Sequence, residues 1–275
     1  MAPLEGLHVV TLAVNLPGPV AAARFHALGA RVTKVEPPAG DPLALACPDL
    51  YRDLSAGQEV RQLDLKDPAQ RKALDELLAG SDLLLTSSRP AALERLGLAW
   101  DRLHRRFPQL CHVAIVGHPP PHENTPGHDL TYVAQQGLLR PPELPPTLLA
   151  DLGGAEQAVS AGLALLLARE RTGEAGYASV ALSAAAEAFA LPLRHGLTRP
   201  GGLLGGGLPG YNVYRTADGW IALAALEPHF WQRLLAALEL DQATAADLAA
   251  IFATRPGAEW TRWAQEHDIP LVALP

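Results

Sequence analysis

With 275 residues, 48% of them hydrophobic and 19% charged, the chain can bury a large core in one big domain or in two unequal ones. Its 22 basic and 29 acidic residues give a formal net charge of -7. No cluster of Lys and Arg could follow a phosphate backbone or an anionic membrane, which argues against nucleic acid and membranes as partners.

The N-terminal sequence, the apolar segments and the cysteines indicate the cellular compartment. The N-terminus has no basic region followed by an apolar one, and apolar segments such as residues 161–168 are too short to cross a bilayer. Cys47 and Cys111 lie far apart and belong to no CxxC or His/Cys ligand spacing. We therefore expect a cytoplasmic protein with reduced thiols and no metal site.

The N-terminal part of the chain alternates strand and helix. A β-branched run at 9–12 precedes an Ala-rich helix at 20–28, and a second strand follows at 31–36. This order predicts a βαβ unit, a parallel sheet and a ligand crevice at the carboxyl ends of the strands. The turn after the first strand has no GxGxxG fingerprint, which argues against a nicotinamide cofactor.

The same alternation continues toward the middle of the chain. The patterns predict strands at 82–86, 111–116 and 177–182, and helices at 67–78, 91–96, 101–106 and 153–170. A Pro-rich connector follows the strand at 111–116, and a loop after a sheet strand is where catalytic groups are usually carried. The first domain is thus expected to be α/β and Rossmann-like.

A change of composition at 198–207, which is rich in glycine, predicts a hinge between two domains. A hairpin at 211–215 and 220–225, followed by a helix at 228–238, is typical of a small α+β domain. We expect a large domain over residues 1–200 and a small C-terminal domain over residues 201–275.

A histidine and a carboxylate mark the candidate site. His128 follows Gly127, and Asp151 stands 23 residues later, shortly before Gly153 and Gly154. An imidazole and a carboxyl are sufficient to remove a proton from a carbon and to return one by general acid–base catalysis. Each also has a simpler interpretation, because His128 could be a solvated loop residue and Asp151 could cap the helix that follows.

Five segments resemble, in order and spacing, the family III coenzyme A transferases of the CaiB/BaiF superfamily. They are PLEGLHVV at 3–10, LGARVTKVEPPAGD at 28–41, LDLK at 63–66, Arg89-Pro90 with LGL at 96–98, and RERTG at 169–173. Because they cover nearly the whole chain, the resemblance is much more specific than any single motif.

Within this superfamily the chain most resembles the α-methylacyl-CoA racemases. The segment around His128 resembles the one that carries a catalytic histidine, and Asp151 falls at the catalytic aspartate. Residues 225–230 resemble the segment whose glutamate, here Glu227, pairs with that histidine. The resemblance implies an acyl-CoA racemase or epimerase that inverts the α-carbon of a 2-methylacyl-CoA or a related thioester by two-base proton transfer.

Two alternatives stay open. In a family III CoA transferase Asp151 would be acylated and His128 would be incidental, whereas a catalytically weakened homologue would only bind an acyl-CoA. The enolate of the racemase needs hydrogen-bond donors, and we expect the backbone N–H groups of Gly153 and Gly154, at the start of the predicted helix, to supply them.

The resemblance also implies how coenzyme A, as part of the substrate, is bound. The matching positions are Asn15, Leu16, Leu63, Lys66 and Arg95, and Arg89 is a further basic candidate. It implies no separate cofactor, since the thioester itself acidifies the proton, and it implies an interlocked homodimer.

The chain departs from the family pattern in three places. Pro37 stands where relatives commonly have an arginine, and LSAGQ at 54–58 replaces a basic stretch, so two cationic contacts with the nucleotide are expected to be missing. The loop at 117–125 is short and rich in proline. We expect the C-terminal domain to be truncated relative to the family, since the sequence ends at Pro275.

Overall fold

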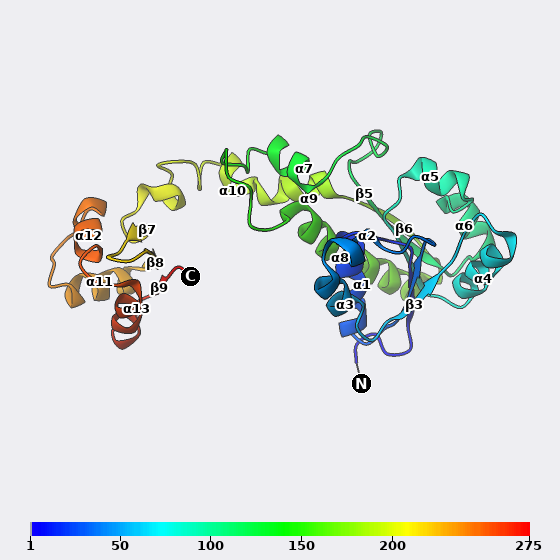
Figure 1. Cartoon of the computed structure of the whole chain (residues 1–275), viewed down its shortest axis with the longest axis horizontal. Helices are drawn as coiled ribbons and strands as arrows, with labels where there is room; N and C mark the ends of the chain where they lie inside the picture. Colours follow the sequence, from blue (N-terminus) through cyan, green and yellow to red (C-terminus); the bar gives the residue numbers. More distant parts are fainter. Residues whose placement is uncertain (1) are drawn as a thin grey trace. The chain divides into compact units, whose positions relative to one another are not determined.

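The computed structural model describes residues 2–275, which form two compact units. The first unit ends at Ala190, and the second covers Leu191–Pro275. Each unit has its own sheet (Figure 1). The sheet of the first unit has six strands and that of the second has three, and each unit has its own buried apolar core.

The sheet of the first unit is parallel throughout and has the strand order β3-β2-β1-β4-β5-β6. The direction in which strands are added reverses between β1 and β4, and such a switch point leaves a crevice beyond the carboxyl ends of the two strands. The predicted Rossmann-like α/β fold is confirmed. The strands are β1 (His8–Thr11), β2 (Arg31–Glu36), β3 (Glu59–Gln62), β4 (Leu83–Thr86), β5 (Cys111–Val116) and β6 (Tyr177–Ala181).

Helices cover both faces of this sheet. Val9 and Val10 are each 0% exposed, because successive residues of a strand point to opposite faces and both faces are packed. Val9 belongs to the core under α1 (Pro17–Ala27) and α8 (Leu149–Thr172), and Val10 to the core under α4 (Pro68–Ala79), α5 (Pro90–Arg95) and α6 (Trp100–Arg106). The remaining helices are α2 (Pro42–Ala46), α3 (Pro48–Ser55), α7 (Asp129–Gln135) and α9 (Leu182–Phe189).

The long helix α8 begins at Leu149 and not at residue 153 as predicted. Its first turn is stabilised by a distant side chain, because the backbone N–H of Asp151 donates to Oδ1 of Asp129 at 3.0 Å. A local sequence pattern cannot reveal a helix cap that comes from 22 positions earlier in the chain. Gly153 and Gly154 consequently lie inside the helix.

The edge strand β3 was not predicted. Its four residues are all exposed and have no alternation of apolar and polar side chains. Strand prediction depends on burial of at least one face, so an exposed polar edge strand gives little signal.

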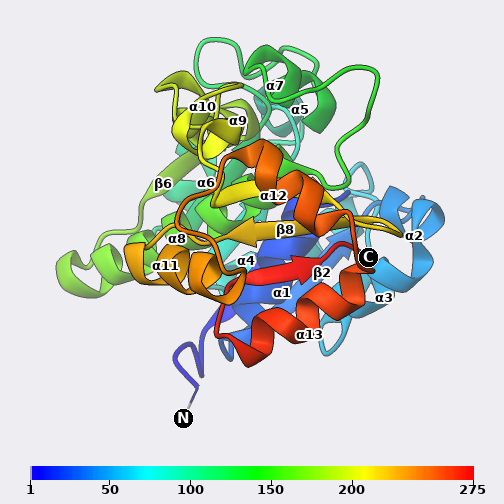
Figure 2. The same cartoon turned by 90° about the vertical axis from the view of Figure 1, so that its left-hand side faces the viewer.

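The second unit is built on the antiparallel sheet β7-β8-β9. Trp260 and Phe252 are almost completely buried in the same core as Ile221 of the central strand. Figure 2 shows the central strand β8 between the other two strands of this sheet. The observed hairpin and the helix after it agree with the predicted ranges. The elements are α10 (Leu191–Arg194), β7 (Tyr211–Arg215), β8 (Trp220–Ala224), α11 (Pro228–Ala237), α12 (Ala245–Phe252), α13 (Gly257–Glu266) and β9 (Leu271–Ala273).

Residues 2–275 contain no helix that combines the length and the apolar character needed to cross a bilayer. Nor do these residues group three or more His, Cys, Asp or Glu side chains so that they could hold a metal ion. Cys47 is exposed, whereas Cys111 is buried in β5, and both thiols are free.

Candidate active site

A pocket of about 240 Å³ opens in the first unit where the loops after β1, β4 and β5 meet α7 and α8. This is the switch-point position expected from the strand order. Four of the residues singled out in the sequence line it together: Asn15, Arg89, His128 and Asp151. Ser87, Glu123, Thr125 and Tyr132 add further polar groups to its wall.

His128 reaches the pocket because it directly precedes α7. Its backbone is extended, with φ of -142° and ψ of 168°, and its carbonyl accepts a hydrogen bond from the backbone N–H of Thr131 at 2.8 Å. The side chain of His128 lines the pocket and is exposed, so a ligand can reach the imidazole. Glu227 directly precedes α11 in the second unit, and its pairing with His128 stays a prediction.

Asp151 stands in the first turn of α8 and is partly buried. Burial, with a contribution from the nearby Asp129 carboxylate, raises the pKa of Asp151 from 3.8 to about 6, and His128 opposes this rise. The side chain of Asp129 is itself only 5% exposed. Asp151 is therefore a carboxyl that can both take and release a proton near neutral pH.

The positions matched to coenzyme A binding fall into neighbouring cavities. Leu63 and Lys66 line a second pocket, of about 470 Å³, which also includes Glu36 and Pro37 and shares Val14 with the first. Pro37 therefore contributes no cationic group to the wall of this cavity, whereas Lys66 does.

Arg95 and Leu16 lie elsewhere. Arg95 lines a third pocket, of about 410 Å³, together with Arg71, Arg102 and Arg106, and this pocket shares Leu96 with the second. Leu16 directly precedes α1 and lines none of the three pockets. The first unit thus brings together Asn15 and Arg89, and separately Leu63 and Lys66.

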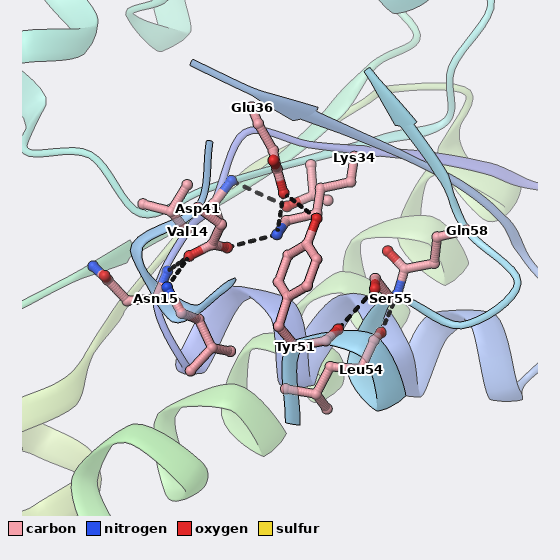
Figure 3. A network of polar contacts seen from close by, with 12 residues as sticks. Val14, Asn15, Lys34, Glu36, Asp41, Tyr51, Leu54, Ser55 and Gln58 are labelled. Carbon is pink, nitrogen blue, oxygen red and sulfur yellow. Dashed lines mark hydrogen bonds and ion pairs between the residues drawn. The ribbon is translucent and has the colours of Figure 1, made fainter. Parts of the chain in front are cut away.

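A buried ionic network supports the loop that carries Asn15 (Figure 3). Nζ of Lys34 lies 2.5 Å from Oδ2 of Asp41 and 2.7 Å from Oε1 of Glu36, and 4.6 Å from the ring centre of Tyr51. Oδ1 of Asp41 accepts a hydrogen bond from the backbone N–H of Asn15 at 2.9 Å. The ion pair therefore fixes the turn after β1, where Asn15 has a φ of 68°.

The glycines expected to stabilise an enolate do not have that role. Because α8 begins at Leu149, the N–H groups of Gly153 and Gly154 are beyond the first turn, where N–H groups bond within the helix. A Cβ at Gly153 would overlap with the ring of Phe189, and one at Gly154 would overlap with Leu182. These glycines allow α9 to pack closely on α8, and the expectation that they donate to the substrate was wrong.

Sequence reasoning missed Tyr132 and Glu123 as pocket residues. Tyr132 lies one turn after His128 in α7, so the helical spacing of the two residues was the available signal. Glu123 comes from the irregular loop after β5, where no periodic pattern indicates which side chains face inward.

Comparison with known proteins gives one consistent result. Residues 4–274 match the model of CoA-transferase family III. The chain is 32% identical to human alpha-methylacyl-CoA racemase, over 94% of this chain and 74% of that protein. It is 29% identical to the probable fatty acyl-CoA transferase Rv3272 of Mycobacterium tuberculosis, over 84% of this chain and 68% of that protein.

Solved structures agree with these sequence matches. The crystal structure of Rv3272 superposes with a TM-score of 0.84 at 27% identity, covering 100% of this chain and 83% of that one. The relatives also include cinnamoyl-CoA:phenyllactate CoA-transferase of Clostridium sporogenes, which is 33% identical over 61% of this chain and 46% of that protein. Racemases and transferases are thus both among the relatives.

Proposed function

The chain belongs to the family III CoA transferases, and we propose that within this family it is an acyl-CoA racemase or epimerase. Its substrate in this proposal is a 2-methylacyl-CoA or a related thioester, whose α-carbon it inverts. Inversion needs one group that removes the α-proton from one face and a second that delivers a proton to the other. His128 and Asp151 are these two groups, and the resemblance to the racemases assigns Glu227 as the partner of His128.

The observation that carries this proposal is the shared pocket of His128 and Asp151, in which burial raises the pKa of Asp151 to about 6. An imidazole and a carboxyl can each act as acid or as base, so either enantiomer of the substrate can enter the reaction.

The same proposal assigns the neighbouring pockets to coenzyme A. Asn15 and Arg89 contact the end near the thioester, whereas Leu63, Lys66 and Arg95 contact the nucleotide. Leu16, which lines none of these pockets, is proposed as a contact from the resemblance alone. Lys and Arg suit phosphates because their charges are complementary. No separate cofactor enters, since the thioester itself acidifies the α-proton. The proposed interlocked homodimer is tested by light scattering of the purified protein.

Solvent exchange tests the reaction directly. Purified protein is incubated in heavy water with a panel of 2-methylacyl-CoA substrates and no acyl acceptor, and deuterium at the α-carbon is followed by mass spectrometry. We expect incorporation with the wild type and loss of at least about 100-fold in rate with His128→Ala or Asp151→Asn. His122→Ala is the matched control, because His122 is an exposed histidine of the same loop that does not line the pocket.

A CoA transferase is the second candidate, favoured by the transferases among the relatives and by the half-buried carboxylate of Asp151. In that reaction the carboxylate attacks the thioester, forms an acyl anhydride with the protein and releases the thiol of coenzyme A. Hydroxylamine would then trap the acyl group at Asp151. A covalent adduct without deuterium exchange would favour the transferase over the racemase. The absence of both signals would indicate a homologue that only binds an acyl-CoA.

A further inference from the structure

The pocket contains a buried hydroxyl that the two-base scheme does not use. The side chain of Tyr132 is 2% exposed and lines the pocket together with His128 and Asp151. Because the residue lines the pocket, a ligand seated there can accept a hydrogen bond from its hydroxyl.

Two glycines make the space that this hydroxyl occupies. A Cβ at Gly127 would lie 2.7 Å from the hydroxyl oxygen of Tyr132, and one at Gly117 would overlap with the same oxygen. Both glycines line the pocket themselves. The ring is held from another side by His118, whose centroid lies 5.2 Å away in an edge-to-face contact. The position of the hydroxyl at the pocket wall is therefore fixed by its surroundings.

The chemistry of this hydroxyl follows from its electrostatic environment. Burial and then the Asp151 carboxylate raise the pKa of Tyr132, against a smaller opposite effect of Arg89. A phenol with a raised pKa stays protonated near neutral pH. It therefore acts as a hydrogen-bond donor and not as a base.

Proton removal from the α-carbon creates a need for such a donor. When a base takes the α-proton, the electron pair of the C–H bond moves toward the thioester carbonyl, and its oxygen becomes the enolate oxygen. Donors already in place at that oxygen lower the barrier. The glycine N–H groups expected from the sequence lie inside α8, so they do not supply this contact.

We propose that the hydroxyl of Tyr132 donates a hydrogen bond to the thioester carbonyl oxygen and to the enolate oxygen formed from it. Tyr132 keeps its own proton throughout, and the returning proton is delivered to the α-carbon by His128 or Asp151. This role rests on the proposed racemase function, because it is the enolate of that reaction whose negative charge builds on the thioester oxygen.

Tyr132→Phe removes the hydroxyl and keeps the ring that packs beside Gly117 and Gly127. We expect the rate of deuterium exchange at the α-carbon to fall about 100-fold, as for loss of one such donor, with little change in KM. Tyr177→Phe is the control, because Tyr177 is a tyrosine of the same unit that does not line the pocket. Gly117→Ala, which would displace the hydroxyl, should reproduce the loss.

A spectroscopic readout separates a direct contact from a structural effect. With an acyl-CoA labelled with 13C at the thioester carbon, the carbonyl stretch of the bound ligand should lie at lower frequency in the wild type than in Tyr132→Phe. If the wild type catalyses exchange and Tyr132→Phe lowers its rate less than threefold, the proposed role of Tyr132 is wrong, while the racemase proposal stands. Absence of exchange by the wild type would overturn the racemase proposal and this inference with it.

Discussion

Lys34 and Asp41 form an ion pair, with Nζ 2.5 Å from Oδ2, although the two side chains are only 2% and 0% exposed. Glu36, 4% exposed, is the second carboxylate on the same ammonium group. Each of these buried charges is stable only with its partner, because an unpaired charge away from water would destabilise the folded state by its full desolvation energy. The turn after β1 depends on the same contacts through the N–H of Asn15.

Lys34→Met should destabilise the first unit strongly, because it leaves the carboxylates of Glu36 and Asp41 buried without their cation. We expect the free energy of unfolding, measured with urea, to fall by about 3–5 kcal/mol. Lys72→Met is the control, since Lys72 forms an exposed pair with Glu76 at 3.9 Å and should change that free energy by less than about 1 kcal/mol. Equal effects of the two substitutions would contradict the importance of burial.

Asp41 should influence ligand affinity through Asn15. Asp41→Ala removes the acceptor of the Asn15 N–H, whereas Asp41→Asn keeps an oxygen for it and loses the charge opposite Lys34. We expect acyl-CoA affinity, measured by calorimetry on folded protein, to fall about tenfold more in Asp41→Ala than in Asp41→Asn. If both variants bind equally well, the turn holds its shape without Asp41.

Asp151 should make stability depend on pH in an unusual direction. Its folded pKa of about 6 lies above the ordinary value of 3.8, so between these pH values the folded state keeps a proton that the unfolded state has released. Its contribution to stability therefore decreases as pH rises from 4 to 6. Asp151→Asn should stabilise the protein by about 2 kcal/mol at pH 7.5 and by much less at pH 4.

Urea titrations of the wild type and Asp151→Asn at both pH values measure this difference. A gain in stability that is the same at pH 4 and pH 7.5 would mean that the ionised carboxylate is not destabilised by its site.

His112 should have the opposite dependence. This residue of β5 is 1% exposed, its Nε2 lies 3.0 Å from the hydroxyl oxygen of Thr86, and Nδ1 has no hydrogen-bond partner among the described residues. Burial lowers the pKa of His112 from 6.5 to about 3, so the unfolded state takes up a proton first. Stability that is present above pH 6.5 is lost as the pH falls toward 3.

A variant tests this effect. His112→Met removes the titrating ring and should flatten the loss of unfolding free energy between pH 6.5 and pH 4, whereas His122→Ala should not, because His122 is exposed. An unchanged slope in His112→Met would show that other groups cause the acid sensitivity.

The sequence predicted most of the first unit because its strands are buried on both faces. The run at 111–116 matches β5, and the run at 31–36 matches β2. The first is apolar apart from His112, a pattern that burial on both faces produces, whereas the second is indicated by its β-branched residues Val32, Thr33 and Val35. The exposed edge strand β3 gave no such signal.

The candidate site could be predicted only in part. His128 and Asp151 stand next to glycines and turn signals, and resemblance supplied their roles, which no local pattern contains. The start of α8 depends on a hydrogen bond to Asp129, and the position of the Tyr132 hydroxyl depends on the space beside Gly117 and Gly127. Both are tertiary contacts. Such contacts become visible only when the chain is folded.

One consequence concerns the two thiols. Cys47 is exposed at the junction of α2 and α3, while Cys111 is 0% exposed, and the sequence has 2 cysteines in all. A maleimide fluorophore will therefore attach to the native protein at a single place. Because α2 begins next to Asp41, the dye would report by stopped-flow fluorescence how fast the Asn15 turn responds when an acyl-CoA arrives.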